Sequence, residues 1–416
     1  MYNIYLFSMA MLFLFSIVAP ISIHTQMEES KAVNTPGNYA QDKAFLKSHK
    51  IDFIELTDQS RKACLLISPT LQGRVVTSTD NGENGKSYGW INYKYINSGE
   101  LSSQFNPYGG EERLWLGPEG GPFSIYFQKG KEQSFENWKV PKEIDTESFI
   151  VRSQTSSSVS FFKNFALVNA SGMKLEVGIE RTVKLLAKSN IEEILAINLG
   201  DSLSYVAYES ENILMNQGKV DWNEKNGFLS IWLLSMFNPT EKAVVFVPFK
   251  QGNDAKIGKV VTDDYFGKVP DSRLKQKNGM LFFKVDGKLR SKIGISPNRA
   301  KPWCGSYDPA SKLLTLVWCS LPEMPMKFVN SKWGKQDDPL VGDAINSYND
   351  GPLADGSMMG PFYEIETSSP AALLSSGEFI THRQRIFHIS GNESQLSLLT
   401  QKLFGISVTD ITKVFQ

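Results

Sequence analysis

Apolar and polar residues alternate with a period of two along much of the chain. The clearest case is the segment MKLEVGIERTVKL, in which Met173, Leu175, Val177 and Ile179 are separated by polar or small residues. This period places apolar side chains on one face of a strand and polar side chains on the other. The segment is therefore predicted to be a β-strand with one dry face and one wet face.

Other short strand-like runs are separated by Gly, Asn or Pro. They are VVTSTD, FSIYF, LSIWLLSMF, AVVFVPF, MLFFKVDG, KLLTLVWCS, PFYEIET and EFITHRQRIFHI. No repeat of the ~40–50 residues typical of a propeller blade is visible. Many strands with no repeat and no linker after residue 36 predict one large antiparallel β-sandwich.

Helical spacing is confined to the edges of this pattern. Gly37–Lys50 is predicted to form one short helix that leads into the first strand. Leu340–Tyr348 and Ser394–Phe404 also have helical spacing, and Asn392 or Ser394 can cap the second of them. The expected fold is therefore all-β, a single large domain with a few short peripheral helices.

The N-terminal segment differs in composition from the rest. Residues 1–26 contain the apolar run Ile4–Val18, which is nearer to a signal peptide than to a membrane span of ~20 residues. No Lys or Arg precedes the run, so an uncleaved anchor stays open. Residues 27–44 are predicted to form a linker and short helix, and residues 45–416 the sandwich domain. We expect export to the periplasm or the extracellular space.

Charge and cysteine content narrow the class of protein. The chain has 416 residues, with 44 basic and 44 acidic residues, which argues against a nucleic-acid partner. Three cysteines are too few for a disulfide framework. Cys64 is expected to be a buried thiol. Cys304 and Cys319 flank a predicted hairpin without symmetry, so their pairing stays undecided.

Several motifs of known chemistry are absent from the sequence. There is no P-loop, no dinucleotide-binding glycine motif, no zinc-ligand spacing and no Gly-x-Ser-x-Gly elbow. The stretch TDNGENG has oxygen ligands but departs from the EF-hand pattern at its third position. A calcium site therefore stays open without support from the sequence, and we expect neither a metal nor another cofactor.

One glycine-rich segment, GGEERLWLGPEGGPFSIYF, concentrates charge beside an indole. Its charged and indole residues are Glu111, Glu112, Arg113, Trp115 and Glu119. Such a segment is either a solvated loop or the rim of a polar binding site. We favour the rim, because the interleaved apolar residues must stay packed and hold the acids in place.

The strand PFYEIET carries two further acids. Alternation places Glu364 and Glu366 on the same face. Two carboxylates that share a site raise the pKa of one of them, which suits it to proton transfer. The alternative interpretation is a solvated outer face.

The following strand, ITHRQRIFHI, supplies the candidate imidazole. Only His382 is attractive for acid–base chemistry, since His24 lies near the predicted signal segment and His49 in the leading helix. The alternative for His382 is a hydrogen-bonded structural histidine. The candidate catalytic residues are therefore Glu364, Glu366 and His382.

Further polar residues occur where a sandwich keeps its loops and strand ends. Sugars present arrays of hydroxyl groups, so their sites need planar polar groups and an aromatic face for the C–H side. Beyond the glycine-rich segment, the candidate substrate-binding residues are Arg74, Lys292, Arg299, Asn349, Asp350, Asp355 and Arg383. Trp115, Trp90, Tyr108 and Trp138 are candidates for the aromatic face.

Six segments together resemble a known family. They are LQGRVVTS, GGEERLWLGPEGGPFSIYF, KIGISPNRA, YNDGPLADG, FYEIETSSPAALLSSGEF and THRQRIFHI. They resemble an uncharacterised family of exported bacterial proteins in the galactose mutarotase-like superfamily, over about residues 45–405. The resemblance implies a β-supersandwich whose wide concave sheet holds a carbohydrate.

Aldose 1-epimerases of that superfamily use a glutamate base and a histidine acid. The resemblance implies that the strand with Glu364 and Glu366 carries the glutamate. The chain departs from the pattern because it has no histidine between His49 and His382. Two functions stay open: an exported carbohydrate-active protein that uses acid–base epimerisation or related glycan chemistry, and a non-catalytic glycan-binding protein that has lost the acid–base pair.

Overall fold

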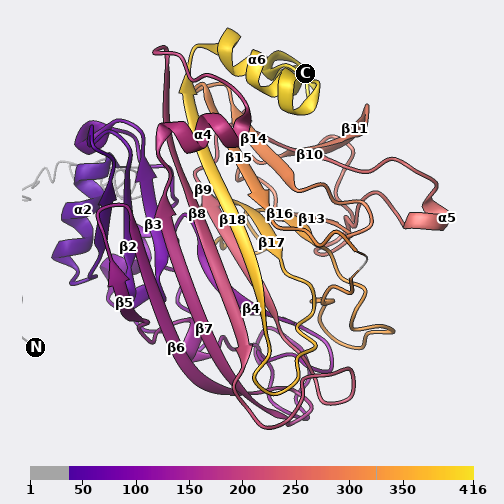
Figure 1. Ribbon diagram of the computed structural model, residues 1–416. Coiled ribbons are helices and arrows are strands. Elements are labelled where there is room, and N and C mark those ends of the chain that lie inside the picture. The colour runs from indigo at the N-terminus through magenta and orange to yellow at the C-terminus, as the bar shows by residue number, and fades with distance from the viewer. Residues whose placement is uncertain (1–36, 325) are drawn as a thin grey trace, which may run out of the picture. The chain divides into compact units, whose positions relative to one another are not determined.

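The structure is a computed structural model that describes residues 37–324 and 326–416 (Figure 1). The predicted signal peptide or anchor and most of the predicted linker lie outside the described residues. No helix in the described part of the chain is long and apolar enough to cross a membrane.

Three antiparallel sheets make up the fold. The three-stranded sheet has the order β1 (Ile54–Thr57), β2 (Cys64–Ser68), β3 (Arg74–Thr79). The ten-stranded sheet has the order β11 (Leu274–Lys277), β12 (Met280–Lys284), β10 (Val244–Pro248), β14 (Trp303–Asp308), β15 (Leu313–Cys319), β18 (Phe379–Gly391), β8 (Leu203–Asn216), β7 (Lys174–Leu185), β6 (Ser158–Val168), β5 (Ile150–Gln154). The five-stranded sheet has the order β13 (Ser291–Ile295), β16 (Ile345–Asn349), β17 (Tyr363–Ser368), β9 (Ser230–Phe237), β4 (Arg113–Gly117).

The helices are short and lie between or after strands. They are α2 (Tyr39–Ser48), α3 (Tyr93–Ser98), α4 (Lys188–Leu195), α5 (Asp254–Ile257), α6 (Glu393–Phe404) and α7 (Val408–Lys413), with 3₁₀ turns η1 (Pro69–Leu71), η2 (Gly82–Asn84) and η3 (Lys142–Ile144). These elements confirm the predicted all-β fold with a few short peripheral helices.

Two of the three helices expected from the sequence are present. Helix α2 begins after Asn38, whose side chain accepts a hydrogen bond from the Gln41 backbone. Helix α6 is capped by Asn392, which accepts from the Ser394 and Gln395 backbone N–H groups. Asn392, rather than Ser394, is therefore the cap.

The helix expected at Leu340–Tyr348 is wrong, because the second half of that segment belongs to strand β16. Every residue of β16 is buried, since the strand has side chains packed on both faces and pairs with β13 and β17 on its two edges. A short strand that is buried on both faces gives no alternation in its sequence, so its apolar spacing resembled that of a helix.

The main core lies between the ten-stranded and five-stranded sheets, which pack face to face (Figure 1). Val317 and Ile386 contribute to it from the large sheet, and Leu233, Ile293 and Ile365 from the smaller one. All five side chains are fully buried. One face of the five-stranded sheet is thus covered by the ten-stranded sheet, and the other face takes no part in this packing.

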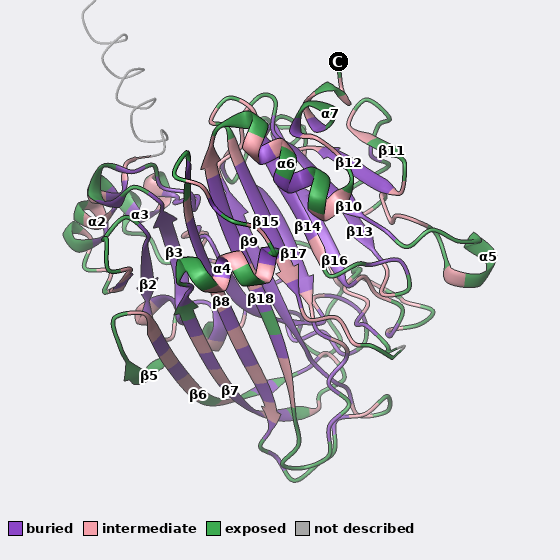
Figure 2. Ribbon diagram, turned by 45° about the horizontal axis from the view of Figure 1, so that its top comes forward, coloured by how far each residue is buried: buried purple, intermediate pink, exposed green. Residues whose placement is uncertain are grey.

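Helices cover part of the outer face of the large sheet. Ile191 of α4, Leu396 of α6 and Ile411 of α7 pack in one apolar cluster with Phe246 of β10 and Leu316 of β15. Strands under these helices are therefore buried on both sides, whereas β6 and β7 alternate between buried and more exposed residues (Figure 2). The alternation predicted for MKLEVGIERTVKL is confirmed in β7.

The cysteines are all buried and free. Cys64 is a buried thiol, as predicted. Cys304 and Cys319 lie on the paired strands β14 and β15, where Cys304 is opposite Val317 and not opposite Cys319. They form no disulfide bond.

The packing between the sheets predicts a large difference between two isoleucine truncations. Ile386→Ala empties a fully buried site in β18 and is expected to lower the free energy of unfolding by ~2–5 kcal/mol. Ile150→Ala makes the same chemical change in β5, where the side chain is exposed, and is expected to change it by less than ~0.5 kcal/mol. Urea denaturation measures both, and equal effects would contradict the assignment of the core.

Candidate functional site

Strand β17 sends alternate side chains to opposite sides of the five-stranded sheet. Tyr363 and Thr367 point toward the large sheet, where the Tyr363 hydroxyl is 2.8 Å from Ser306 Oγ of β14. Glu364 and Glu366 therefore point to the other side, which we call the free face of the sheet. They share a face, as the sequence predicted.

Strand register gathers further polar residues on the free face. Glu364 is opposite Tyr348 of β16, and Tyr348 is opposite Lys292 of β13. On the other side of β17, Glu366 is opposite Leu234 of β9, which is opposite Arg113 of β4. Directly opposed residues lie ~4.5–5.5 Å apart, so the free face brings together groups from distant parts of the chain.

A pocket of about 400 Å³ opens on this face, a volume within the range of small-molecule sites. Its ionisable lining residues include Arg113, Glu119, Arg290, Lys292 and Glu364. Its aromatic lining is formed by Tyr95, Phe105, Trp115, Phe135, Trp138, Trp232, Phe266, Trp333, Tyr348 and Phe362. Charged groups thus lie among many aromatic rings.

Glu366 is bound on one carboxylate oxygen by two donors. Lys292 Nζ is 2.8 Å from Glu366 Oε2, and Trp232 Nε1 donates to the same oxygen at 2.9 Å. Lys292 Nζ also lies 5.2 Å from the centroid of the Trp232 ring. The indole therefore orients both members of this buried ion pair.

Glu364 has a weaker partner. Arg113 Nη2 lies 3.5 Å from Glu364 Oε1. The guanidinium is stacked on the ring of Trp115, with its carbon 3.9 Å from the ring centroid. This stacking holds Arg113 in place, so the two acids of β17 differ in the closeness of their cations.

The pocket changes the acidity of its groups. Burial, together with the negative charge of Glu366, raises the pKa of Glu364 to about 8. Burial raises the pKa of Glu119 to about 7, although the charge of Lys292 opposes the change. Burial alone lowers the pKa of Lys292, but the charge and hydrogen bond of Glu366 outweigh it and raise that pKa. Glu364 is therefore a protonated carboxyl group at neutral pH.

Two acids of the glycine-rich segment lie outside this pocket. Glu112 Oε1 is 2.7 Å from Arg181 Nη2, and its other oxygen accepts from Gln384 Nε2 at 2.7 Å. Glu111 Oε1 accepts from Ser78 Oγ at 2.8 Å and is 3.0 Å from His388 Nε2. Both side chains are completely buried. The segment is therefore divided: Arg113, Trp115 and Glu119 line the pocket, whereas Glu111 and Glu112 are bound in the interior.

His382 also lies in the interior, between the two large layers. Its Nε2 is 2.9 Å from Thr367 Oγ1. Because Thr367 donates its one hydroxyl proton to Gln384 Oε1, Nε2 must carry a hydrogen and donate to Thr367. Burial lowers the pKa of His382 to about 4. The structural interpretation of this histidine fits the geometry, and it does not line the pocket.

Two predicted arginines bind backbone carbonyl groups and do not line the pocket. Arg74 donates from Nη1 to Gly109 O at 2.6 Å. Arg299 donates from Nη1 to Lys250 O at 2.9 Å and from Nε to Gly258 O at 2.9 Å. Both side chains are buried, and they hold loops in place because each guanidinium offers several donors to carbonyl oxygens.

The remaining predicted residues also lie outside the pocket lining. Asn349 holds a turn by accepting from Gly287 N at 2.9 Å. Asp355 is exposed and accepts from a nearby backbone N–H. Arg383 is exposed on the ten-stranded sheet and pairs with Glu211 at 2.5 Å. Asp350 is buried behind the pocket residue Tyr348, whose hydroxyl donates to it at 2.6 Å.

Several pocket residues were not expected from the sequence. Trp232, Phe266, Arg290, Trp333 and Tyr348 all line the cavity. Every residue of strand β9, which contains Trp232, is buried, so its sequence shows no polar face. The one signal in the sequence was the alternation of side chains along the strand. It identifies Trp232 as a residue of the free face only when the register of β9 with β17 is known.

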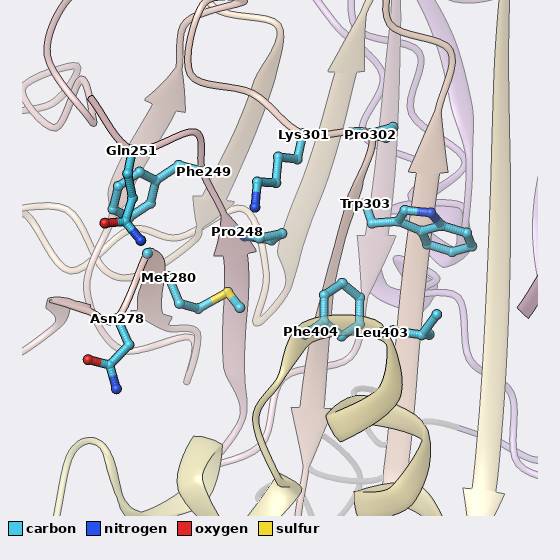
Figure 3. Close-up of a pocket in the computed structure, with 11 residues that line it drawn as sticks. Pro248, Phe249, Gln251, Asn278, Met280, Lys301, Pro302, Trp303, Leu403 and Phe404 are labelled. Carbon is cyan, nitrogen blue, oxygen red and sulfur yellow. The ribbon is translucent and has the colours of Figure 1, made fainter. Parts of the chain in front are cut away.

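A second pocket, of about 410 Å³, lies between the ten-stranded sheet and α6 (Figure 3). It is lined by Pro248, Phe249, Gln251, Asn278, Gly279, Met280, Lys301, Pro302, Trp303, Leu403 and Phe404. Lys301 is its one ionisable lining residue, so it offers no acid–base pair. Among residues 37–324 and 326–416, no group of three or more His, Cys, Asp and Glu residues is placed to hold a metal ion.

The burial of His382 predicts a pH-dependent stability. Burial lowers the pKa of His382 from the usual 6.5 to about 4 in the folded state. The contribution of the neutral imidazole to the free energy of unfolding is therefore complete above pH ~6.5 and falls as the pH decreases toward 4. The loss reaches about 3 kcal/mol. The difference in unfolding free energy between the wild type and His382→Gln should therefore shrink over this range. His49→Gln, at a partly exposed histidine, is the control, and a difference that does not vary with pH would contradict the prediction.

Several solved structures are similar to this chain. A galactose mutarotase-like protein from Lactobacillus casei ATCC 334 has a TM-score of 0.46 and 11% identity, covering 81% of this chain and 100% of that one. A putative aldose 1-epimerase from Escherichia coli K12 has a TM-score of 0.47 and 9% identity, covering 82% and 100%. At such TM-scores these matches transfer neither a sugar nor an activity to this chain.

Comparison with curated proteins gives no match. One family model, described as a family of unknown function (DUF6786), matches residues 37–415. Because this match spans nearly all of the described residues, the chain belongs to the family of unknown function DUF6786.

Proposed function

We propose that the protein binds a carbohydrate in the pocket on the free face of the five-stranded sheet. The observation that carries this proposal is the combination of many aromatic rings with Arg113, Lys292 and Glu364 in one cavity. Sugars offer C–H patches that pack on aromatic rings and hydroxyl groups that bond to planar charged groups. Both kinds of partner are available here on one surface.

Unpartnered polar atoms near the pocket support a polar ligand. Within the described residues, Arg113 Nε, Trp115 Nε1 and Glu366 Oε1 are buried without a hydrogen-bond partner. Such atoms are rare in folded proteins and often mark a place that a ligand or water completes. A saccharide, which is rich in hydroxyl groups, has the matching donors and acceptors.

An acid–base reaction on the bound sugar is the second candidate function. Glu364 is protonated at neutral pH because its pKa is raised to about 8, and Glu366 is ion-paired with Lys292. Two neighbouring carboxyl groups in different protonation states form an acid–base pair. In epimerisation at the anomeric carbon, Glu366 takes the proton of the anomeric hydroxyl and Glu364 protonates the ring oxygen. The C1–O5 bond then breaks, rotation about the C1–C2 bond presents the other face of the aldehyde carbon to O5, and ring closure on that face reverses both proton transfers.

The predicted signal segment adds a location to the proposal. An apolar run with the length of Ile4–Val18 is typical of exported proteins. The protein is therefore proposed to meet its sugar in the periplasm or outside the cell, without a metal or nucleic-acid partner.

Binding is tested with matched tryptophan variants. Trp333→Ala removes a partly exposed ring from the pocket and is expected to weaken sugar binding about tenfold, a change of ~1.4 kcal/mol. Trp318→Ala is the control, since this ring is also partly exposed but lies outside the pocket lining. Calorimetry against mono- and oligosaccharides measures both variants. The absence of binding to any sugar, or equal losses in both variants, would argue against the proposal.

Catalysis is tested with Glu364→Gln, which keeps the shape of the side chain and removes its transferable proton. It is expected to reduce turnover at least ~100-fold while sugar binding persists. Wild-type turnover is expected to fall as pH rises through about 8, because Glu364 must be protonated. NMR exchange between anomers measures the rate, and Glu209→Gln on an ion pair of the large sheet is the control. Sugar binding without conversion in the wild type would favour the non-catalytic alternative.

A further inference from the structure

Among the described residues, Arg290 is the one cation of the pocket lining without a carboxylate partner. It directly precedes β13 and lines the cavity. Arg113 is paired with Glu364 and Lys292 with Glu366. Among the described residues, no carboxylate oxygen lies within 4.0 Å of a nitrogen of Arg290.

The acid whose pKa responds to the charge of Arg290, Asp350, is already bound by other donors. Asp350 lies close enough for that charge to lower its pKa, although burial has the larger and opposite effect. Its Oδ1 accepts from the Tyr348 hydroxyl at 2.6 Å, and its Oδ2 accepts from Gly360 N at 3.0 Å. Both carboxylate oxygens of Asp350 are therefore bound by donors other than Arg290.

An aromatic ring holds the Arg290 guanidinium at the pocket. Its central carbon lies 4.1 Å from the centroid of the Phe266 ring, and Phe266 itself lines the cavity. Stacking uses the face of the guanidinium and leaves its N–H edge free to bind in the plane. Such an edge binds the two oxygens of an anionic group.

The balance of charge in the pocket also favours a bound anionic group. Three cations line it, namely Arg113, Arg290 and Lys292. The pKa values of Glu364 and Glu119, about 8 and about 7, mean that neither acid is fully ionised at neutral pH. Even with Glu366 ionised, positive charge exceeds negative charge, and a bound anion would neutralise it.

We infer that the ligand of this pocket is an acidic saccharide, and that Arg290 binds its anionic group. The inference rests on the proposed sugar-binding function and specifies the class of sugar. A guanidinium recognises a carboxylate, a sulfate ester and a phosphate ester by the same paired hydrogen bonds. The shared feature is therefore an anionic substituent with at least two oxygens.

Calorimetry with matched ligands tests the inference. The probes are galacturonate, galactose 6-sulfate, galactose 6-phosphate and neutral galactose, together with the disaccharides of galacturonate and galactose. At least one acidic probe is expected to bind ten times more tightly than its neutral parent. Arg290→Gln is expected to lower the affinity for the acidic probe at least ten times more than the affinity for its neutral parent, and Arg290→Lys is expected to retain part of the preference. Added salt should weaken the acidic complexes selectively.

Arg383→Gln is the control, since Arg383 is an exposed arginine on the ten-stranded sheet. The acidic probe that shows the preference identifies the anion. Equal affinity for acidic and neutral sugars, or a preference that survives Arg290→Gln in a folded variant, overturns the inference and leaves the proposed function standing. If no sugar of either kind binds, the proposed function fails as well. Circular dichroism on each variant establishes that it is folded.

Discussion

The structure depends on a buried polar network that connects the two main sheets. Arg181 of β7 and Glu112, just before β4, form an ion pair in which both side chains are fully buried. Glu112 also accepts from Gln384 of β18, and Gln384 accepts from Thr367 of β17. Removing two charges from water carries a large penalty, so the pair is tolerated only when its remaining donors and acceptors are satisfied. Satisfying them requires the sheets to meet in one register.

This register determines what the free face of the five-stranded sheet presents. Because the side chains of Ile365 and Thr367 point into the interior, the alternation along the strand places Glu364 and Glu366 on the opposite side of the sheet. Next to the buried Glu112, Arg113 is turned to the free face by the same alternation. In each strand, the residues that point away from the interior are therefore the ones that form the pocket. A register shift of one residue would exchange the pocket side chains with the interior side chains.

Alternation alone predicted part of this arrangement. The two faces of MKLEVGIERTVKL and the common face of Glu364 and Glu366 follow from local geometry, and both are present. Alternation does not say which of two polar faces is interior. His382 was placed in the site for this reason, although the structure uses it between the layers. Strands that are buried on both faces, such as β9 and β16, hide their pocket residues completely.

Contacts between residues that are distant in the sequence explain why the other site residues could not be predicted. Arg299 looked like a binding residue because an arginine beside a loop is typical of a site, yet its donors are taken by the carbonyl groups of residues 250 and 258. Arg290 had no such signal, because its lack of an ion-pair partner is visible only when every neighbouring carboxylate has been placed. The availability of a charged group is a property of the whole fold and not of its local sequence.

The same reasoning explains how two identical side chains, Glu364 and Glu366, come to have different surroundings. Glu366 has Lys292 and Trp232 within 2.9 Å of one oxygen, whereas the cation nearest to Glu364, Arg113, is 3.5 Å away and stacked on Trp115. Two donors thus bind one oxygen of the first acid directly. Burial, together with the negative charge of the first acid, raises the pKa of the second acid to about 8, so that it keeps its proton at neutral pH. The packing of two tryptophans thus holds the lysine close to one carboxyl group and the arginine farther from the other, so that the two glutamates of β17 have different surroundings.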